Sequence, residues 1–282
     1  MSLRAHCVGA ASVFALSASG ALAQTWRTVD ASRQLRDTTA ISVRLEYAAG
    51  TLELRPTTGG SLYQMNVRYD AERSEPISRY DASARSLTLG VRSHGLHLRS
   101  GSTQAGSMHA ELSNKVPMDL SLELGAVEAD IQLGGLRLTD LTVKTGAADV
   151  AVRFDQPNPD RLRSMTLEVG AASLKLVRAG NSGVERVNAN VGVGALDLDL
   201  GGELTRDVDV LGSLAMGGFT LHVPREIGVS VDASTFLADF DKSGLVKRGD
   251  LWYTPGYEEA RRHVRVRVKA FLGGFTVVRD SR

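Results

Sequence analysis

Three features of the sequence predict an all-β fold of stacked repeats, a single-stranded β-solenoid. The first is a recurring motif in which an apolar residue, a glycine and a small residue precede an alternating apolar strand, as at Leu124-Gly125-Ala126. The second is its spacing, because the motif glycines recur 21, 24, 24 and 23 residues apart, at Gly125, Gly146, Gly170, Gly194 and Gly217. A steady period of this size is typical of stacked repeats. The third is that little of the chain has the apolar spacing of a helix.

We interpret each motif glycine as a corner between two strands of one repeat. Leu120, Leu122 and Leu124 alternate before Gly125, which places them on one face of a strand. Glycine reaches φ > 0 without steric cost and lets the neighbouring repeat approach closely. The predicted structural corners are Gly125, Gly146, Gly170, Gly194, Gly217 and, in a last copy of the motif, Gly273.

Stacking should bury continuous apolar columns, since one repeat cannot cover its own apolar face. After the corners, the expected column is Ile131, Val152, Leu174, Leu198 and Leu221. Before the corners, the expected column is Leu122, Val143, Leu167, Ala189, Val210 and Val231. On the outer surface, stacking should place opposite charges side by side at Glu123, Lys144 and Glu168, each two residues before its glycine.

Residues 1–23 have the features of a cleaved export signal. Arg4 and His6 give a weakly basic start, and Ala21-Leu22-Ala23 matches an A-x-A cleavage site. An uncleaved membrane anchor is the alternative, but the stretch is short and rich in serine. No later segment is long and apolar enough to span a membrane. We therefore expect an exported protein, periplasmic or extracellular, without a transmembrane segment in its mature chain.

Residues 24–114 are predicted to form a smaller N-terminal β region. Residues 25–39 are polar and should be an irregular lead-in, and the charged segment 72–76 ends in proline, which indicates a loop. We place a domain boundary near Asn114. Strands are expected at residues 41–47, 51–55, 62–69, 86–92 and 109–113.

Residues 115–282 carry the regular repeats. Residues 236–240 stand where the corner after Gly217 is due. Residues 241–262 form a longer excursion, and we expect its Trp252-Tyr253 pair to cover the end of the solenoid rather than to stack on a sugar. The last copy of the motif spans residues 263–278. Its exposed edge should be blunted by charges at Arg279, Asp280 and Arg282.

The last copy also contains the only dense basic stretch of the chain. Valines alternate there with Arg265, Arg267 and Lys269, so the three basic residues should share the outer face of one strand. They are a candidate contact for an acidic polymer of the cell envelope, because a row of like charges raises the local potential. The alternative is a solvated strand face that is balanced by Asp209 and Asp232.

The composition excludes some partners and sites. Cys7 is the only cysteine and lies in the leader, so the mature chain can form neither a disulfide nor a thiolate metal site. Without the leader the chain loses one of its 33 lysines and arginines and none of its 32 acidic residues. A net charge near zero argues against bulk binding of nucleic acid. No cofactor is expected.

The other candidate sites favour structural roles. His94, His97 and His109 could ligate zinc, but two of them lie in a glycine- and serine-rich loop without acidic residues close by. Ser182 lies among turn formers and has no recognisable His and acid partners, so we interpret it as a loop residue.

Asp197 and Asp199 share one strand face and could bind calcium or serve acid–base chemistry. The lysine expected beside them on the adjacent repeat, Lys175, favours charge compensation instead. The sequence therefore predicts no metal site and no catalytic residues.

The repeated Leu-Gly-Ala corner, the export signal, the N-terminal β region and the closing Phe-Leu-Gly-Gly-Phe-Thr-Val at residues 271–277 resemble a bacterial family. They are similar to the toast-rack proteins, whose C-terminal half resembles the C-terminal domain of LiaF, a regulator of the cell-envelope stress response, and to adhesin-type β-repeat proteins. The resemblance covers residues 119–279 well and residues 41–114 more loosely. It implies a solenoid of stacked rungs and an envelope location, and it supplies no catalytic residues. LiaF has transmembrane helices, which this chain lacks.

Three functions are consistent with these features. The first is an exported, non-catalytic β-solenoid that acts as an interaction or adhesin-like module of the envelope, with an envelope protein or an anionic polysaccharide as partner. The second is a regulatory module of the envelope stress response, which rests on family analogy. The third is a β-helical carbohydrate-active enzyme, which would require clustered carboxylates on consecutive rungs. Ala151, Ser173 and Thr220 dilute such a cluster, so we favour the first function.

Overall fold

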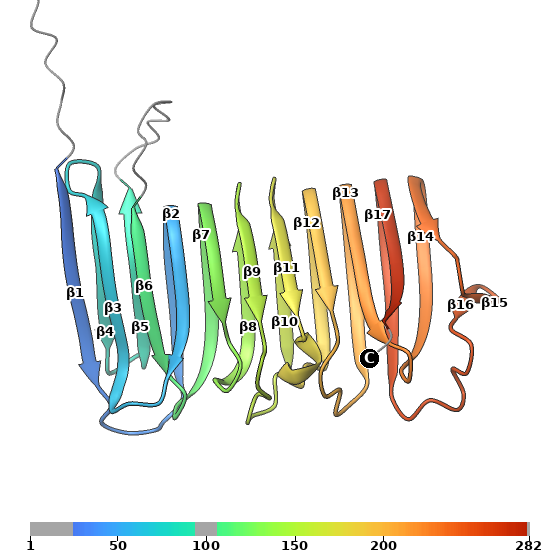
Figure 1. The fold of residues 1–282 in the computed structure, drawn as a ribbon, viewed down its shortest axis with the longest axis horizontal. Helices are drawn as coiled ribbons and strands as arrows, with labels where there is room; N and C mark the ends of the chain where they lie inside the picture. Colours follow the sequence, from blue (N-terminus) through green and yellow to red (C-terminus); the bar gives the residue numbers. More distant parts are fainter. Residues whose placement is uncertain (1–24, 94–105, 281–282) are drawn as a thin grey trace, which may run out of the picture.

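The computed structural model of the chain describes residues 25–93 and 106–280. Nearly all regular structure in these residues is β, which confirms the predicted fold class (Figure 1). One short 3-10 helix, η1, spans Ala179–Ser182. The strands are β1 Trp26–Gln34, β2 Ile41–Thr57, β3 Ser61–Asp70, β4 Ser74–Asp81, β5 Ser86–Ser93, β6 Ser107–Ser113, β7 Pro117–Gln132, β8 Arg137–Thr145, β9 Asp149–Arg153, β10 Ser164–Val169, β11 Ser173–Val177, β12 Arg186–Asp199, β13 Val208–Pro224, β14 Gly228–Asp241, β15 Val246–Arg248, β16 Leu251–Tyr253 and β17 His263–Asp280.

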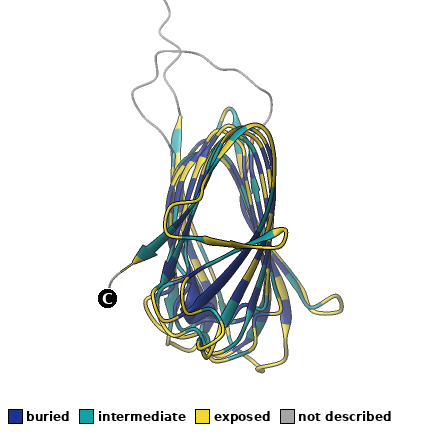
Figure 2. Cartoon of the chain, turned by 90° about the vertical axis from the view of Figure 1, so that its right-hand side faces the viewer, coloured by how far each residue is buried: buried dark blue, intermediate teal, exposed yellow. Residues whose placement is uncertain are grey.

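The strands stack as rungs of a solenoid with two sheet faces. In β7 the first half pairs in parallel with β8 and the second half with β9. The buried positions of β7 are even-numbered up to Leu124 and odd-numbered from Val127. The side of the backbone that faces the core therefore changes at Gly125 and Ala126, where the chain bends from one face to the other. Seen along the stack, the two faces meet in an arch (Figure 2).

Parallel pairing orders the rungs as β2, β7, β8–β9, β10–β11, β12, β13, β17 and β14. The N-terminal region continues this stack, because β2 pairs with β7 along both of its halves. Beyond β2, strands β5 and β4 extend one face, and β6, β3 and β1 extend the other. The predicted boundary near Asn114 falls between β6 and β7, inside one sheet, and a division into two domains stays a prediction.

The last strand of the chain lies inside the stack. β17 pairs with β13 on one side and with β14 on the other. The rings of Phe219, Phe275 and Phe240 follow the same spatial order, with successive centroids 5.2 and 5.7 Å apart. β17 is therefore not the terminal rung. Its residues 277–280 pair with β13 alone, because the pairing with β14 ends at Thr276, so the edge-blunting role of Arg279 and Asp280 stays a prediction. Asp280 also contacts His222 at 3.1 Å, and Arg282 lies outside the described residues.

The interior position of β17 agrees with its apolar pattern. Val264, Val266 and Val268 are buried, so the first half of the strand carries a complete inward face. A strand of this kind gains cross-strand packing from a neighbour on each side. The second half of β14, residues 234–241, is mostly exposed, as expected for the terminal rung of the stack.

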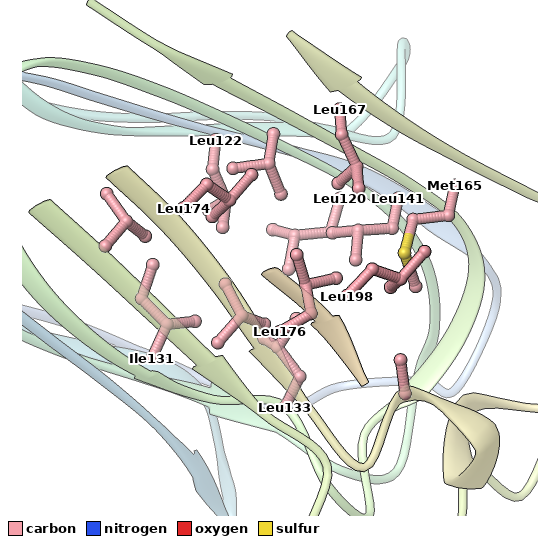
Figure 3. Packing of buried hydrophobic residues seen from close by; sticks show 14 of the residues in the cluster. Leu120, Leu122, Ile131, Leu133, Leu141, Met165, Leu167, Leu174, Leu176 and Leu198 are labelled. Carbon is pink, nitrogen blue, oxygen red and sulfur yellow. The ribbon is translucent and has the colours of Figure 1, made fainter. Parts of the chain in front are cut away.

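The predicted core residues are buried, but three of them, Leu174, Val210 and Val231, are two residues out of register with their columns. After the corners Val152 pairs with Leu176, not Leu174. Before the corners Ala189 pairs with Gly212, not Val210. A shift of two residues keeps a side chain on the same face, so each of these predicted positions still points inward. Figure 3 shows part of the packed interior, including leucines of β7, β11 and β12.

Strands β1 and β4 form where the sequence predicts irregular structure. β1 replaces the expected lead-in, and β4 begins inside the expected loop at residues 72–76. Both strands have partly exposed, polar sequences, so their apolar alternation is weak. β4 pairs only with β5 and can therefore contain Pro76, whose missing N–H would interrupt a central strand.

A hairpin of β15 and β16 crosses the C-terminal end of the stack (Figure 2). β16 pairs with Ser230 and Val231 of β14. Trp252 packs edge-on against Phe240, with ring centroids 6.1 Å apart, beside the core. Trp252 thus covers the end of the solenoid, as predicted.

Among the residues that the structure describes, no helix is long and apolar enough to cross a membrane.

Candidate functional site

A groove of about 940 Å³ crosses the outer surface of the solenoid beside the corners. It runs over β8, β10, β12, β13, β17 and β14, which are neighbours in the stack. Two columns of residues define it. Their members lie two residues apart on each strand, so both columns face outward.

The first column, called here the polar column, begins with an ion pair. Lys144 Nζ lies 3.2 Å from a carboxylate oxygen of Glu168, and Glu123 is in register with Lys144 on the preceding rung. This confirms the predicted outer ladder of alternating charges. From β12 onward the column is uncharged except for one lysine. The full polar column is Lys144, Glu168, Asn190, Ser213, Lys269 and Ser234.

The last four side chains of the polar column are free to bind a ligand. Within residues 25–93 and 106–280, neither a hydrogen bond nor an ion pair occupies the side chains of Asn190, Ser213, Lys269 and Ser234. Three of these side chains are neutral hydrogen-bonding groups, and Lys269 supplies one positive charge.

The second column, called here the floor column, changes from very small to large side chains along the stack. A Cβ on Gly170 would lie 2.7 Å from the carbonyl oxygen of Gly146 on the preceding rung, so this position has no room for a side chain. The Phe236 and Phe271 rings stack with centroids 5.2 Å apart and line the groove on its last two rungs, β17 and β14. The floor column consists of Gly170, Gly192, Ala215, Phe271 and Phe236.

Large apolar side chains project from the corners of the last rungs. In the first repeats the corner residues beside the glycines are alanines, as at Ala126. In the last rungs they are Val193, Met216 and Leu237, which are 57%, 47% and 65% exposed. Phe236 and Phe271 lie next to them and are 71% and 53% exposed. We call these five residues the apolar corner.

The three basic residues of the predicted strand face have different surroundings. Arg265 donates to Asp209 at 2.7 Å and to Asp207 at 3.3 Å. The hydrogen bond to Asp209 raises the pKa of Arg265 above its ordinary value. Arg267 donates to Asp232 at 3.4 Å. Both arginines are therefore neutralised by adjacent acids, whereas Lys269 belongs to the groove.

The corner glycines lie where rungs approach most closely. A Cβ on Gly194 would lie 2.1 Å from the carbonyl oxygen of Ala172. The residue beside Gly170 in the next rung is Gly192 rather than Gly194. The predicted equivalence of Gly170 and Gly194 is therefore wrong by two residues.

The remaining candidate residues have structural partners. His109 lies 3.2 Å from Glu53 and 3.6 Å from Glu111 on the outer surface, while His94 and His97 lie outside the described residues. Ser182 is buried and donates to the carbonyl oxygen of Ala179 at 2.6 Å. This contact supports the interpretation of Ser182 as a loop residue.

The two aspartates of β12, Asp197 and Asp199, contact different groups. Asp197 lies 3.9 Å from Lys175 and 3.3 Å from His222. Asp199 accepts backbone N–H groups from Arg178 and Gly201, at 2.9 and 2.6 Å. In the part of the chain that is described, no group of three or more His, Cys, Asp or Glu side chains could hold a metal ion.

The groove was not predicted from the sequence, although two signals mark it. The residue two positions before the motif glycine is charged in the first repeats, at Glu123, Lys144 and Glu168, and the residue in register with Glu168 on the next rung is the neutral Asn190. Phenylalanines also occupy outward positions of the last two rungs, where an aromatic side chain gains no core packing. Recognising either signal requires the correct register, which depends on where β17 inserts.

Comparison with known families identifies one match. Residues 22–177 match the model of the N-terminal domain of toast_rack, DUF2154, and this segment is more than half of the chain. It includes the region before Asn114 as well as the first regular repeats. No curated protein matches the chain.

Solved structures with a similar fold come from several bacteria. A candidate cell adhesion protein from Clostridium sporogenes is 15% identical, with a TM-score of 0.48 over 90% of this chain and 100% of that one. A candidate adhesin from Bacteroides fragilis is 9% identical, with a TM-score of 0.39 over 91% of this chain and 98% of that one. A candidate lipid-binding protein from Parabacteroides distasonis is 8% identical, with a TM-score of 0.37 over 90% and 96%. At such low sequence identity and TM-score, these similarities assign no function to the chain.

Proposed function

Because the chain belongs to the toast-rack family, we propose that it is an exported, non-catalytic interaction module of the cell envelope with an adhesin-like role. Its partner is a component of the envelope, either a protein or an anionic polysaccharide. Export is supported by the leader at residues 1–23, which lies outside the described residues.

The observation that carries this proposal is the apolar corner. Single exposed apolar residues are ordinary on a protein surface, but contiguous groups of them mark interaction sites. Here Val193, Met216 and Leu237 lie in one line, since Met216 is in register with Val193 and Leu272 is in register with both Met216 and Leu237. The stacked phenyl rings of Phe236 and Phe271 lie beside that line. A partner that covers this edge would bury apolar area at about 25 cal/mol per Å².

The proposal is tested by binding of the purified protein to the native envelope fraction of its source. The Met216→Ser/Leu237→Ser double variant should bind at least about tenfold more weakly than wild type, since tenfold corresponds to about 1.4 kcal/mol of lost apolar contact. Leu211→Ser/Val246→Ser is the matched control, because these exposed apolar side chains lie away from the corner. Equal binding by wild type and both double variants, or no binding by any of them, would contradict the proposal.

A further inference from the structure

We propose that the groove binds an extended acidic polysaccharide along the axis of the solenoid, with Lys269 contacting a carboxylate of the polymer. This inference rests on the proposed function, because it names the chemical class of the envelope partner. It replaces the strand face of Arg265 and Arg267 as the site of contact.

The shape of the groove favours a linear polymer. It crosses six neighbouring strands, and strands in a sheet lie about 4.8 Å apart, so the groove extends for roughly 24 Å. It is open to solvent along its length, and the rings of Phe271 and Phe236 line it on the last two rungs. A chain of several sugar rings fills such a groove, whereas a compact ligand would contact only part of it.

The lining of the groove matches the two surfaces of a sugar ring. Hydroxyl groups at the edge of the ring can exchange hydrogen bonds with Asn190, Ser213 and Ser234, whose side chains have no partner among the described residues. The C–H faces of the ring can pack on the floor column and on the phenyl rings. Binding sites commonly combine an apolar surface with a few polar groups that set orientation.

The charge of the groove selects an acidic polymer. Lys144 is neutralised by Glu168 at 3.2 Å, which leaves Lys269 as the one unpaired cation lining the groove in the described part of the chain. Its neighbours in the polar column, Ser213 and Ser234, are uncharged. A carboxylate on the polymer therefore meets a positive charge that no protein acid compensates.

A sugar chain fits better than an acidic peptide. Extended peptides bind by adding a strand to an exposed sheet edge, where unpaired backbone groups are available. The groove runs across the strands, and β12, β13 and β17 are paired on both sides there. A peptide backbone would find no edge in the groove, whereas sugar hydroxyls need only the side chains.

The test measures the affinity of the full mature chain for polygalacturonate, with dextran as the neutral comparison polymer and polyglutamate as the acidic peptide. Wild type should bind polygalacturonate more tightly than either comparison polymer, and its affinity should fall with added salt. Lys269→Ser should weaken binding about tenfold, and Lys269→Arg should restore it.

Two further variants locate the site. Ala215→Phe should abolish binding by filling the floor of the groove, and phenylalanine already occupies this column on the next two rungs, so the fold should be kept. Arg265→Ser/Arg267→Ser should bind like wild type. Circular dichroism melting of each variant checks that the fold is intact.

Several outcomes would overturn the inference. These are the absence of polygalacturonate binding, equal affinity for dextran or polyglutamate, unchanged binding by folded Ala215→Phe, or a loss confined to the arginine variant. Wild type that binds the envelope fraction through the apolar corner but not polygalacturonate would overturn this inference and leave the proposed function standing. Binding of polygalacturonate without any binding to the envelope through the apolar corner would overturn the proposed function and leave this inference standing.

Discussion

Single missing Cβ atoms decide how closely two rungs can approach at the corners. Gly217 and Gly273 have φ values of +128° and +108°, which L side chains rarely adopt. A Cβ on either would also lie 1.9 Å from the carbonyl oxygen of the glycine on the adjacent rung. That oxygen belongs to backbone and cannot move aside cheaply. Glycine is therefore required here by both the dihedral angle and the space.

Gly170 tests close approach without a positive φ. In Gly170→Val the Cβ would lie 2.7 and 2.8 Å from the carbonyl oxygens of Gly146 and Thr145, so the rungs must separate. We expect a loss of roughly 1–3 kcal/mol in the free energy of unfolding, as for other overpacked sites. Urea denaturation measures this loss.

The matched control is Gly218→Val. A Cβ on Gly218 meets no atom within 4 Å, and its φ is not in the positive region. The control should stay within about 0.5 kcal/mol of wild type, as surface substitutions usually do. Equal stability of Gly170→Val and wild type would show that the rungs are not in close contact at this corner.

Residue patterns predict much of the corner but little of the groove. The motif glycines and the Glu123–Lys144–Glu168 ladder follow from period-two alternation, which is a local signal. The groove depends on which residues of distant rungs become neighbours. Lys269 of β17 lies between Ser213 and Ser234, and no local pattern in the chain indicates this.

At the scale of elements, the turns opposite the corners connect the rungs through side chains. The buried Asn181 donates its side-chain amide to the carbonyl oxygen of Phe154 at 2.7 Å and accepts the N–H of Glu203 at 2.7 Å. Glu185, just before β12, accepts hydrogen bonds from Arg161 and Arg206, which lie in the turns before β10 and β13. Three successive turns are thereby tied together by one carboxylate.

This carboxylate predicts a pH dependence of stability. The hydrogen bonds from Arg161 and then Arg206 lower the pKa of Glu185 from its ordinary value of 4.5 to about 2. A carboxylate whose pKa is lower in the folded state contributes stability above its unfolded pKa, and this contribution is lost as pH falls through the folded pKa. Wild type should therefore melt at a higher temperature than Glu185→Gln at pH 6. The difference should shrink between about pH 4.5 and pH 2.

Glu203→Gln is the control for this titration, since Glu203 is exposed and its carboxylate has no ion-pair partner in the described residues. Its melting temperature should follow that of wild type at every pH. A difference in melting temperature between wild type and Glu185→Gln that stays constant from pH 6 to pH 2 would show that protonation of Glu185 is not coupled to unfolding.

The elements that the sequence predicts least well are those with weak alternation or variable turn length. β1 and β4 are edge strands with partly exposed polar residues, so no complete apolar face marks them. The rungs also differ in the number of residues between corners, so a column extended at fixed spacing from Val152 reaches Leu174 instead of Leu176. The predicted core residues still point inward, because a shift of two residues keeps a side chain on the same face of the strand.

At the scale of the whole molecule, the order of the rungs in space differs from their order in the chain. Solenoid stability comes mainly from contacts between neighbouring rungs. Because β17 lies between β13 and β14, the C-terminal rungs depend on the last segment of the chain. The same insertion assembles the apolar corner and the groove, since Lys269 and Phe271 reach their neighbours only through it. The candidate site is therefore complete only when β17 lies between β13 and β14.

Removal of the last strand tests this arrangement. In a chain that ends at Arg262, β14 loses its parallel partner and β13 loses one of its two partners. Hydrogen exchange should then show lost protection in β13 and β14, while β7 to β11 keep theirs because their neighbours remain. If β17 were instead the terminal rung, β14 would keep its protection by pairing with β13. Full protection of β14 in the shortened chain would therefore contradict the inserted order, and with it the register that places Lys269 beside Ser213 and Ser234.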